Sequence, residues 1–186
     1  MHSEFGNDKP TVELSPHLEK LFDPKFFDAA EVIPYKHVCE EVWFGIKEEE
    51  VGQVDVSTIV VSPSRQVIEI DNTGDELSWL TVECGFPAAQ LIELTSLEIC
   101  FVSEADEDLN ISFQIFYFPG NGDRQDLLPG HQKTLLEKNQ STHVFKLDLK
   151  DIKNVSPSQK DKAALAIFLD TKLKSITIGG IFVNLI

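Results

Sequence analysis

Several side chains with complementary binding chemistry fall on the more polar faces of two expected strands and in a nearby turn. They are Trp79, Thr81, Glu83, Gln114, Phe116, Asn121 and Arg124. A flat aromatic ring can stack on the C–H face of a sugar, and planar amide, carboxylate and guanidinium groups can hydrogen-bond its hydroxyls. This combination of residue types indicates a candidate carbohydrate-binding surface.

Alternating apolar residues assign these side chains to their faces. In the run 77–84, Leu80 and Val82 face the core, so Trp79 must point away from it, because successive side chains of a strand lie on opposite faces. In the run 110–118, Gln114 lies on the less apolar face for the same reason. If the two strands share a sheet, indole and amide meet on one surface. A second interpretation stays open, in which N-terminal residues cover these rings, since outward apolar side chains are usually covered.

From residue 54 onward, short apolar runs recur between turn residues such as proline, glycine and asparagine. The runs are 54–61, 67–71, 77–84, 94–102, 110–118, 133–136, 143–149, 163–169 and 175–185. Many short strands separated by turns predict antiparallel sheets. Each run has one apolar and one mixed face, which favours two sheets packed face to face. We therefore expect an all-β, antiparallel two-sheet sandwich over residues 54–186.

The first 53 residues do not show this pattern of short apolar runs. Prolines at four positions exclude long helices and central strands, so we expect a short, partly helical or irregular extension. Val38, Val42 and Ile46 form an apolar stripe within it. Residues 1–6 have the character of an expression-vector remnant, and residues 7–53 hold too many large apolar side chains for a solvated tail. Residues 7–53 are therefore expected to pack on the sandwich.

The strand pattern of residues 54–186 resembles a jelly-roll sandwich of the galactose-binding-like type, common among carbohydrate-binding modules. The resemblance is carried by the long run 110–118 with its Pro119–Gly122 turn, by the run 144–149 and by the closing run 174–183. It implies a non-catalytic carbohydrate-binding module that is an accessory domain of a larger protein. Such modules often hold a structural calcium ion, but no metal motif aligns here, so no ligand is assigned. The alternative is a protein–protein interaction or assembly domain, or a homo-oligomer, with the same fold.

Charge and motif content exclude several other classes. Sixteen basic and 31 acidic residues give a net charge of −15, which argues against binding nucleic acid or anionic lipid. The sequence contains no HExxH, GxSxG, GxGxxG or P-loop pattern, so we expect no enzyme activity. Cys39, Cys84 and Cys100 lack metal-ligand spacing, and two lie in apolar runs. Their pattern favours a reducing, cytoplasmic compartment.

Overall fold

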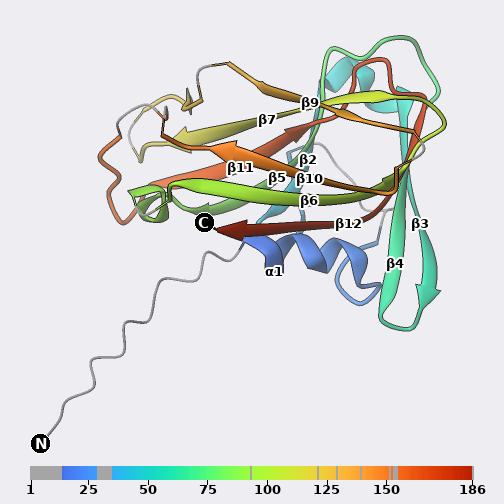
Figure 1. The fold of residues 1–186 in the computed structure, drawn as a ribbon, viewed down its shortest axis with the longest axis horizontal. Coiled ribbons are helices and arrows are strands. Elements are labelled where there is room, and N and C mark those ends of the chain that lie inside the picture. The colour runs from blue at the N-terminus through green and yellow to red at the C-terminus, as the bar shows by residue number, and fades with distance from the viewer. Residues whose placement is uncertain are drawn as a thin grey trace, which may run out of the picture.

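Two antiparallel β-sheets, packed face to face, make up the protein (Figure 1). The computed structural model describes residues 14–28, 35–92, 94–120, 122–128, 130–138, 140–150, 152 and 155–185. Sheet A runs in spatial order through β1 (His37–Cys39), β2 (Val42–Ile46), β5 (Leu80–Pro87), β11 (Lys162–Phe168), β7 (Leu109–Phe118) and β8 (Gln125–Asp126), and β9 (Gln132–Leu136) also pairs with β7. Sheet B runs through β10 (Thr142–Asp148), β6 (Ser96–Glu104), β12 (Ser175–Leu185), β4 (Arg65–Asn72) and β3 (Val54–Ser62).

The hydrophobic core lies between the inner faces of the two sheets. Ile111 and Ile115 of β7 point into it from sheet A, and Leu97, Ile99 and Phe101 of β6 are fully buried in it from sheet B. This alternation of buried positions follows from the pleat of each strand. The expected all-β, antiparallel two-sheet sandwich is confirmed. The three cysteines are free, and two of them are buried.

Helical structure is short in the described part of the chain. It comprises α1 (Leu14–Glu19), the 3₁₀ turn η1 (Lys20–Phe22) directly after it, and the 3₁₀ turns η3 (Glu48–Gln53) and η4 (Ala88–Ile92). None of these described helices is long or apolar enough to cross a bilayer.

Residues 37–46 differ from the expected irregular extension, because they form two strands of sheet A. Val42, Phe44 and Ile46 of β2 are buried, and Phe44 lies opposite Val82 of β5. A spacing of four residues is even, so the stripe Val38, Val42 and Ile46 fits one face of a strand as well as one face of a helix. Sheet A therefore begins before residue 54.

Helix α1 packs along the second half of β12 (Figure 1). β12 pairs with β4 only from Ser175 to Ile178, so the peptide groups beyond that point need another partner on this side. The Ser15 hydroxyl supplies one, since it accepts a bond from Val183 N (2.7 Å) and donates to Val183 O (2.9 Å). Leu14, Leu18 and Leu21 are part of the hydrophobic core.

We predict that Leu18→Ala lowers the free energy of unfolding by about 2–5 kcal/mol, the usual cost of a core cavity. Urea denaturation measures it. Phe26→Ala is the control, because Phe26 lies in the next turn but is 55 % exposed. Equal stability of the Leu18→Ala protein and the parent would mean that α1 is not integral to the fold.

A buried aspartate joins the ends of β7 and β11. Asp161 accepts hydrogen bonds from the Tyr117 hydroxyl (2.6 Å), the backbone and hydroxyl of Ser158 (2.7 and 2.8 Å) and Gly120 N (3.0 Å). The Tyr117 bond, followed by the Ser158 and Gly120 bonds, holds the pKa of this carboxyl well below its usual range. The ionised form is thus the one that the fold stabilises.

The pKa of Asp161 is lower in the folded than in the unfolded chain. Its ionised carboxylate therefore contributes to the free energy of unfolding above the ordinary pKa near 3.8, and this contribution is lost as the pH falls below that value. Asp161→Asn should therefore destabilise the protein at pH 7 and make the remaining stability less sensitive to acid. Urea midpoints at pH 7 and pH 3 test this, with the exposed Asp123→Asn as control. Parallel acid sensitivity of Asp161→Asn and the parent would contradict it.

Candidate functional site

The outer face of sheet A forms the floor of the candidate site. Strand register arranges its side chains in three rows: Trp43, Glu83, Ala166 and Gln114; Gly45, Thr81, Phe168 and Ser112; and Gly85, Ala164, Phe116 and Asp126. The glycines and alanines of these rows on β2, β5 and β11 have short side chains, so the middle of this face forms a depression. A cavity of about 880 Å³ opens there, within the size range of small-molecule sites.

Glu83 is the central polar group of the floor. It is 6 % exposed, and its two oxygens accept hydrogen bonds from Trp43 Nε1 (2.9 Å) and from the Thr81 hydroxyl (2.7 Å). Burial raises the pKa of the Glu83 carboxyl, while the Thr81 and Trp43 hydrogen bonds and the charge of Arg124 oppose that rise. The carboxyl group is therefore held in one orientation and keeps lone pairs for a hydroxyl of a bound molecule.

Gly45 makes room for this network. A Cβ atom at this position would lie 2.7 Å from Glu83 Oε1, still closer to the Thr81 hydroxyl and 3.3 Å from the Tyr35 ring. Any larger residue would displace the Thr81–Glu83 pair, because real Cβ contacts of this length essentially do not occur. β2 thus contributes a space as well as the Trp43 indole.

Tyr35 and Trp79 form one side of the cavity. Trp79 lies immediately before β5 and is half-buried, and its Nε1 donates a hydrogen bond to the Tyr35 hydroxyl (2.9 Å). Tyr35 is exposed, has a left-handed backbone with φ of 59°, and donates its N–H to Phe44 O (2.8 Å). This backbone conformation is uncommon for a bulky residue, and it places the phenol beside the indole.

The opposite side of the cavity combines charged groups with aromatic rings. The Arg124 guanidinium lies 4.2 Å from the centroid of the buried Phe116 ring, and Arg124 Nε is 3.5 Å from Asp126 Oδ1. Phe168 packs edge-on against Phe116, with 6.2 Å between centroids, and against the His131 ring at 4.4 Å. This side therefore offers a guanidinium, a carboxylate and an imidazole around an apolar base.

A smaller hollow of about 300 Å³ continues the same face beyond Tyr35. Its main ring is Trp43, which stacks on His37 with 5.2 Å between centroids and 9° between planes. Phe118 and the Lys162–Glu41 ion pair (3.2 Å) complete it. Tyr35 lines both hollows, so an extended ligand could contact both.

The structure brings five of the seven sequence-predicted residues together. Trp79, Thr81, Glu83, Phe116 and Arg124 all line the larger cavity. Gln114 lies on the same face but is 1 % exposed, and its Oε1 accepts bonds from Ile115 N and Leu128 N (both 2.9 Å). Gln114 therefore holds the β7–β8 region in place. Asn121 lies outside the described residues.

Sequence reasoning missed further cavity residues: Tyr35, Ser112, Asp126, His131, Phe168 and Asp170. Alternation within 163–169 would have placed Phe168 on the outer face with its small neighbours. Tyr35 could not be found in this way, because its position depends on β2 pairing with β5. His131 had no detectable signal, since only the path of the chain between β8 and β9 brings it to Phe168.

The loops around 71–76 and 104–108 are rich in carboxylates, the ligand type that calcium prefers. Within the part of the chain that the structure describes, no three His, Cys, Asp or Glu side chains gather in a metal-binding arrangement.

Comparisons with known proteins concern the fold. No family model and no curated protein matches the chain. A candidate sugar-binding protein from Bacteroides thetaiotaomicron matches at 12 % identity and a TM-score of 0.51, over 86 % of this chain and 92 % of that one. The family 11 carbohydrate-binding module from Clostridium thermocellum, solved with a β-1,3-1,4-mixed-linked tetrasaccharide, matches at 13 % identity and a TM-score of 0.49. The match covers 87 % of this chain and 94 % of that one. The CBM22-1 xylan-binding domain from Paenibacillus barcinonensis matches at 10 % identity and a TM-score of 0.45. The match covers 76 % of this chain and 85 % of that one.

The chain has a jelly-roll sandwich fold, which it shares with the candidate sugar-binding protein from Bacteroides thetaiotaomicron. The resemblance expected from the sequence is thereby confirmed at the level of the fold.

We predict that the Trp43 indole N–H resonance titrates with a midpoint above pH 4.5, the ordinary glutamic acid value, because burial raises the pKa of Glu83. Two-dimensional NMR over pH 3–8 measures it, and the Trp79 indole, bonded to Tyr35, is the internal control. Glu83→Gln should abolish the titration. Its persistence in that variant would assign the shift to another group.

Proposed function

We propose that this chain is a non-catalytic carbohydrate-binding module, an accessory part of a larger protein, and that its ligand binds in the sheet A cavity. The observation that carries the proposal is the composition of this cavity. Trp79 and Tyr35 stand on one side, Arg124 and Asp126 on the other, and the oriented Glu83 carboxyl lies between them. Rings for C–H faces and fixed polar groups for hydroxyls are what saccharide binding requires.

The exposure of Trp79 bears on the competing assembly function. An indole fully covered by N-terminal residues would favour assembly, whereas an open one would favour a sugar ligand. Tyr35 covers part of the ring, yet Trp79 still lines the open cavity. Among the N-terminal residues that the structure describes, Tyr35 thus takes part in the cavity without filling it, which favours ligand binding on this face.

Charge restricts the class of glycan. The chain carries a net charge of −15, and the carboxylates of Glu83, Asp126 and Asp170 line the cavity beside Arg124 and Lys133. Sulfated or uronic sugars would be repelled on approach by the overall field. Neutral or cationic saccharides are therefore the favoured ligands.

We predict that a glycan array returns neutral or cationic saccharides, and that Trp79→Ala weakens binding of the best of them about 30-fold or more, as loss of a dominant aromatic contact does. Calorimetric titration of folded proteins measures it. Phe182→Ala is the matched control, because Phe182 is an exposed ring on the outer face of sheet B.

Two outcomes would count against the proposed function. An array without any glycan hit would remove the carbohydrate ligand, and one with only acidic hits would contradict the charge argument. Equal affinities for folded Trp79→Ala and the parent would place the binding site outside this cavity.

A further inference from the structure

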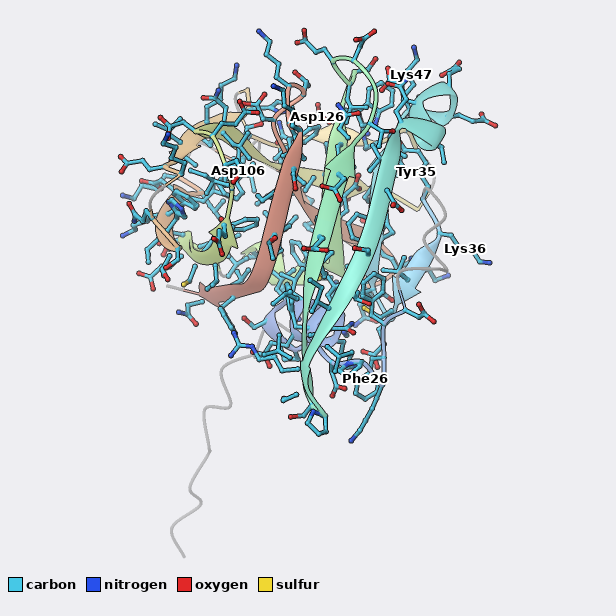
Figure 2. All side chains as sticks on the ribbon, turned by 90° about the vertical axis from the view of Figure 1, so that its right-hand side faces the viewer. Phe26, Tyr35, Lys36, Lys47, Asp106 and Asp126 are labelled. Carbon is cyan, nitrogen blue, oxygen red and sulfur yellow. The ribbon has the colours of Figure 1, made fainter. Side chains whose placement is uncertain are left out.

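β3 is an edge strand of sheet B. Eight of its nine residues pair with β4 along one side, Val61 forms a bulge between Val60 and Ser62, and no other described strand pairs with its second side. Figure 2 looks onto this β3–β4 hairpin, whose tip lies beside Phe26. Such an edge presents a row of peptide N–H and C=O groups that another strand can bind.

The edge also presents apolar side chains. Ile59, Val60 and Val61 are consecutive and are 48, 59 and 62 % exposed. Three consecutive exposed apolar residues are unfavourable on a surface unless they have a partner. Asp55 is the only charged residue of β3, and the strand contains no lysine or proline.

The other sheet edges are protected in the ways usual for natural proteins. β10, at the opposite edge of sheet B, carries Lys146 and Asp148. In sheet A, the edge strand β1 has three residues, β8 has two, and β9 carries Lys133. β3 is thus the longest edge strand among the described strands, and Asp55 and the bulge at Val61 are its protective features.

We propose that β3 pairs antiparallel with β3 of a second copy of this chain, around a twofold axis at Thr58, the middle residue of the strand. In this register Ser57 faces Ile59 of the second copy, Val56 faces Val60, and Asp55 lies next to the bulged Val61. The two five-stranded sheets become one ten-stranded sheet, a size that open sheets reach. A twofold interface of this kind is the commonest in homo-oligomers.

Charge distribution supports a second copy as the partner. Asp55 lies beside Asp71 at one end of the hairpin, and Arg65 lies at the tip, beside Ser62. Antiparallel pairing brings the acidic end of one hairpin next to the Arg65 end of the other, twice per dimer. Asp55 never meets Asp55, so like charges are kept apart in spite of the net charge of −15.

The pairing makes opposite predictions for two substitutions at one position. Val61→Asp places an aspartate next to Asp55 of the second copy and should weaken the dimer, whereas Val61→Lys places a lysine there and should preserve or strengthen it. Their dissociation constants should differ roughly tenfold or more, because each cross-strand charge pair occurs twice. Sedimentation velocity from micromolar to about 1 mM measures association. The controls are Val144→Asp and Val144→Lys, since Val144 is 61 % exposed on β10 and should respond to neither charge.

A cysteine pair tests the register directly. Thr58→Cys should give a covalent dimer under mild oxidation, because the two cysteines face each other at the axis. Val61→Cys should not, because its copies would be about 20 Å apart. Far-ultraviolet circular dichroism confirms that each variant is folded.

Two results would overturn the proposal. A parent protein that stays monomeric to about 1 mM would exclude self-pairing and leave the edge to an extended segment of another protein. A dimer that both Val61 substitutions weaken equally, or that Thr58→Cys does not cross-link, would place the interface on another surface. Neither result depends on whether the cavity of sheet A binds a glycan.

Discussion

The buried carboxyl group of Glu83 is the constraint on which the cavity depends. A carboxyl on the floor of an apolar sheet face is tolerated only when its oxygens have hydrogen-bond partners. Trp43 and Thr81 supply them: Thr81 lies two residues away on β5 itself, and Trp43 reaches Glu83 because β2 pairs with β5. Gly45 must remain small for the same reason. One polar group thus links the position of a strand, the choice of a glycine and the shape of the site.

The N-terminal residues are accordingly part of both the fold and the site. Helix α1 completes the edge of β12 through Ser15, β2 supplies the partner of Glu83, and Tyr35 forms one side of the cavity. Packing of this segment and the shape of the cavity are therefore coupled. Destabilising the docked segment would loosen the binding face even though its residues lie far from β7 and β11 in sequence.

The two sheets divide the proposed roles between separate surfaces. The cavity opens on the outer face of sheet A, while the edge that has no pairing partner among the described strands belongs to β3 of sheet B. Pairing through β3 would leave both cavities open and would join them in one particle. Two linked sites on one polysaccharide chain raise the apparent affinity without any new contact, provided that both can engage together.

The fold class and the faces of the strands could be predicted from the sequence alone, because alternation and turn residues are local signals. The runs around Leu80 and Gln114 placed Trp79, Thr81, Glu83 and Phe116 on one side of sheet A for this reason. Three features could be seen only in the tertiary structure: Val42 lies on a strand, the Tyr35 hydroxyl accepts a hydrogen bond from Trp79, and the Gln114 amide oxygen accepts one from the backbone N–H of Leu128. These outcomes depend on strand order, and strand order is set by packing between residues distant in sequence, which no local pattern records.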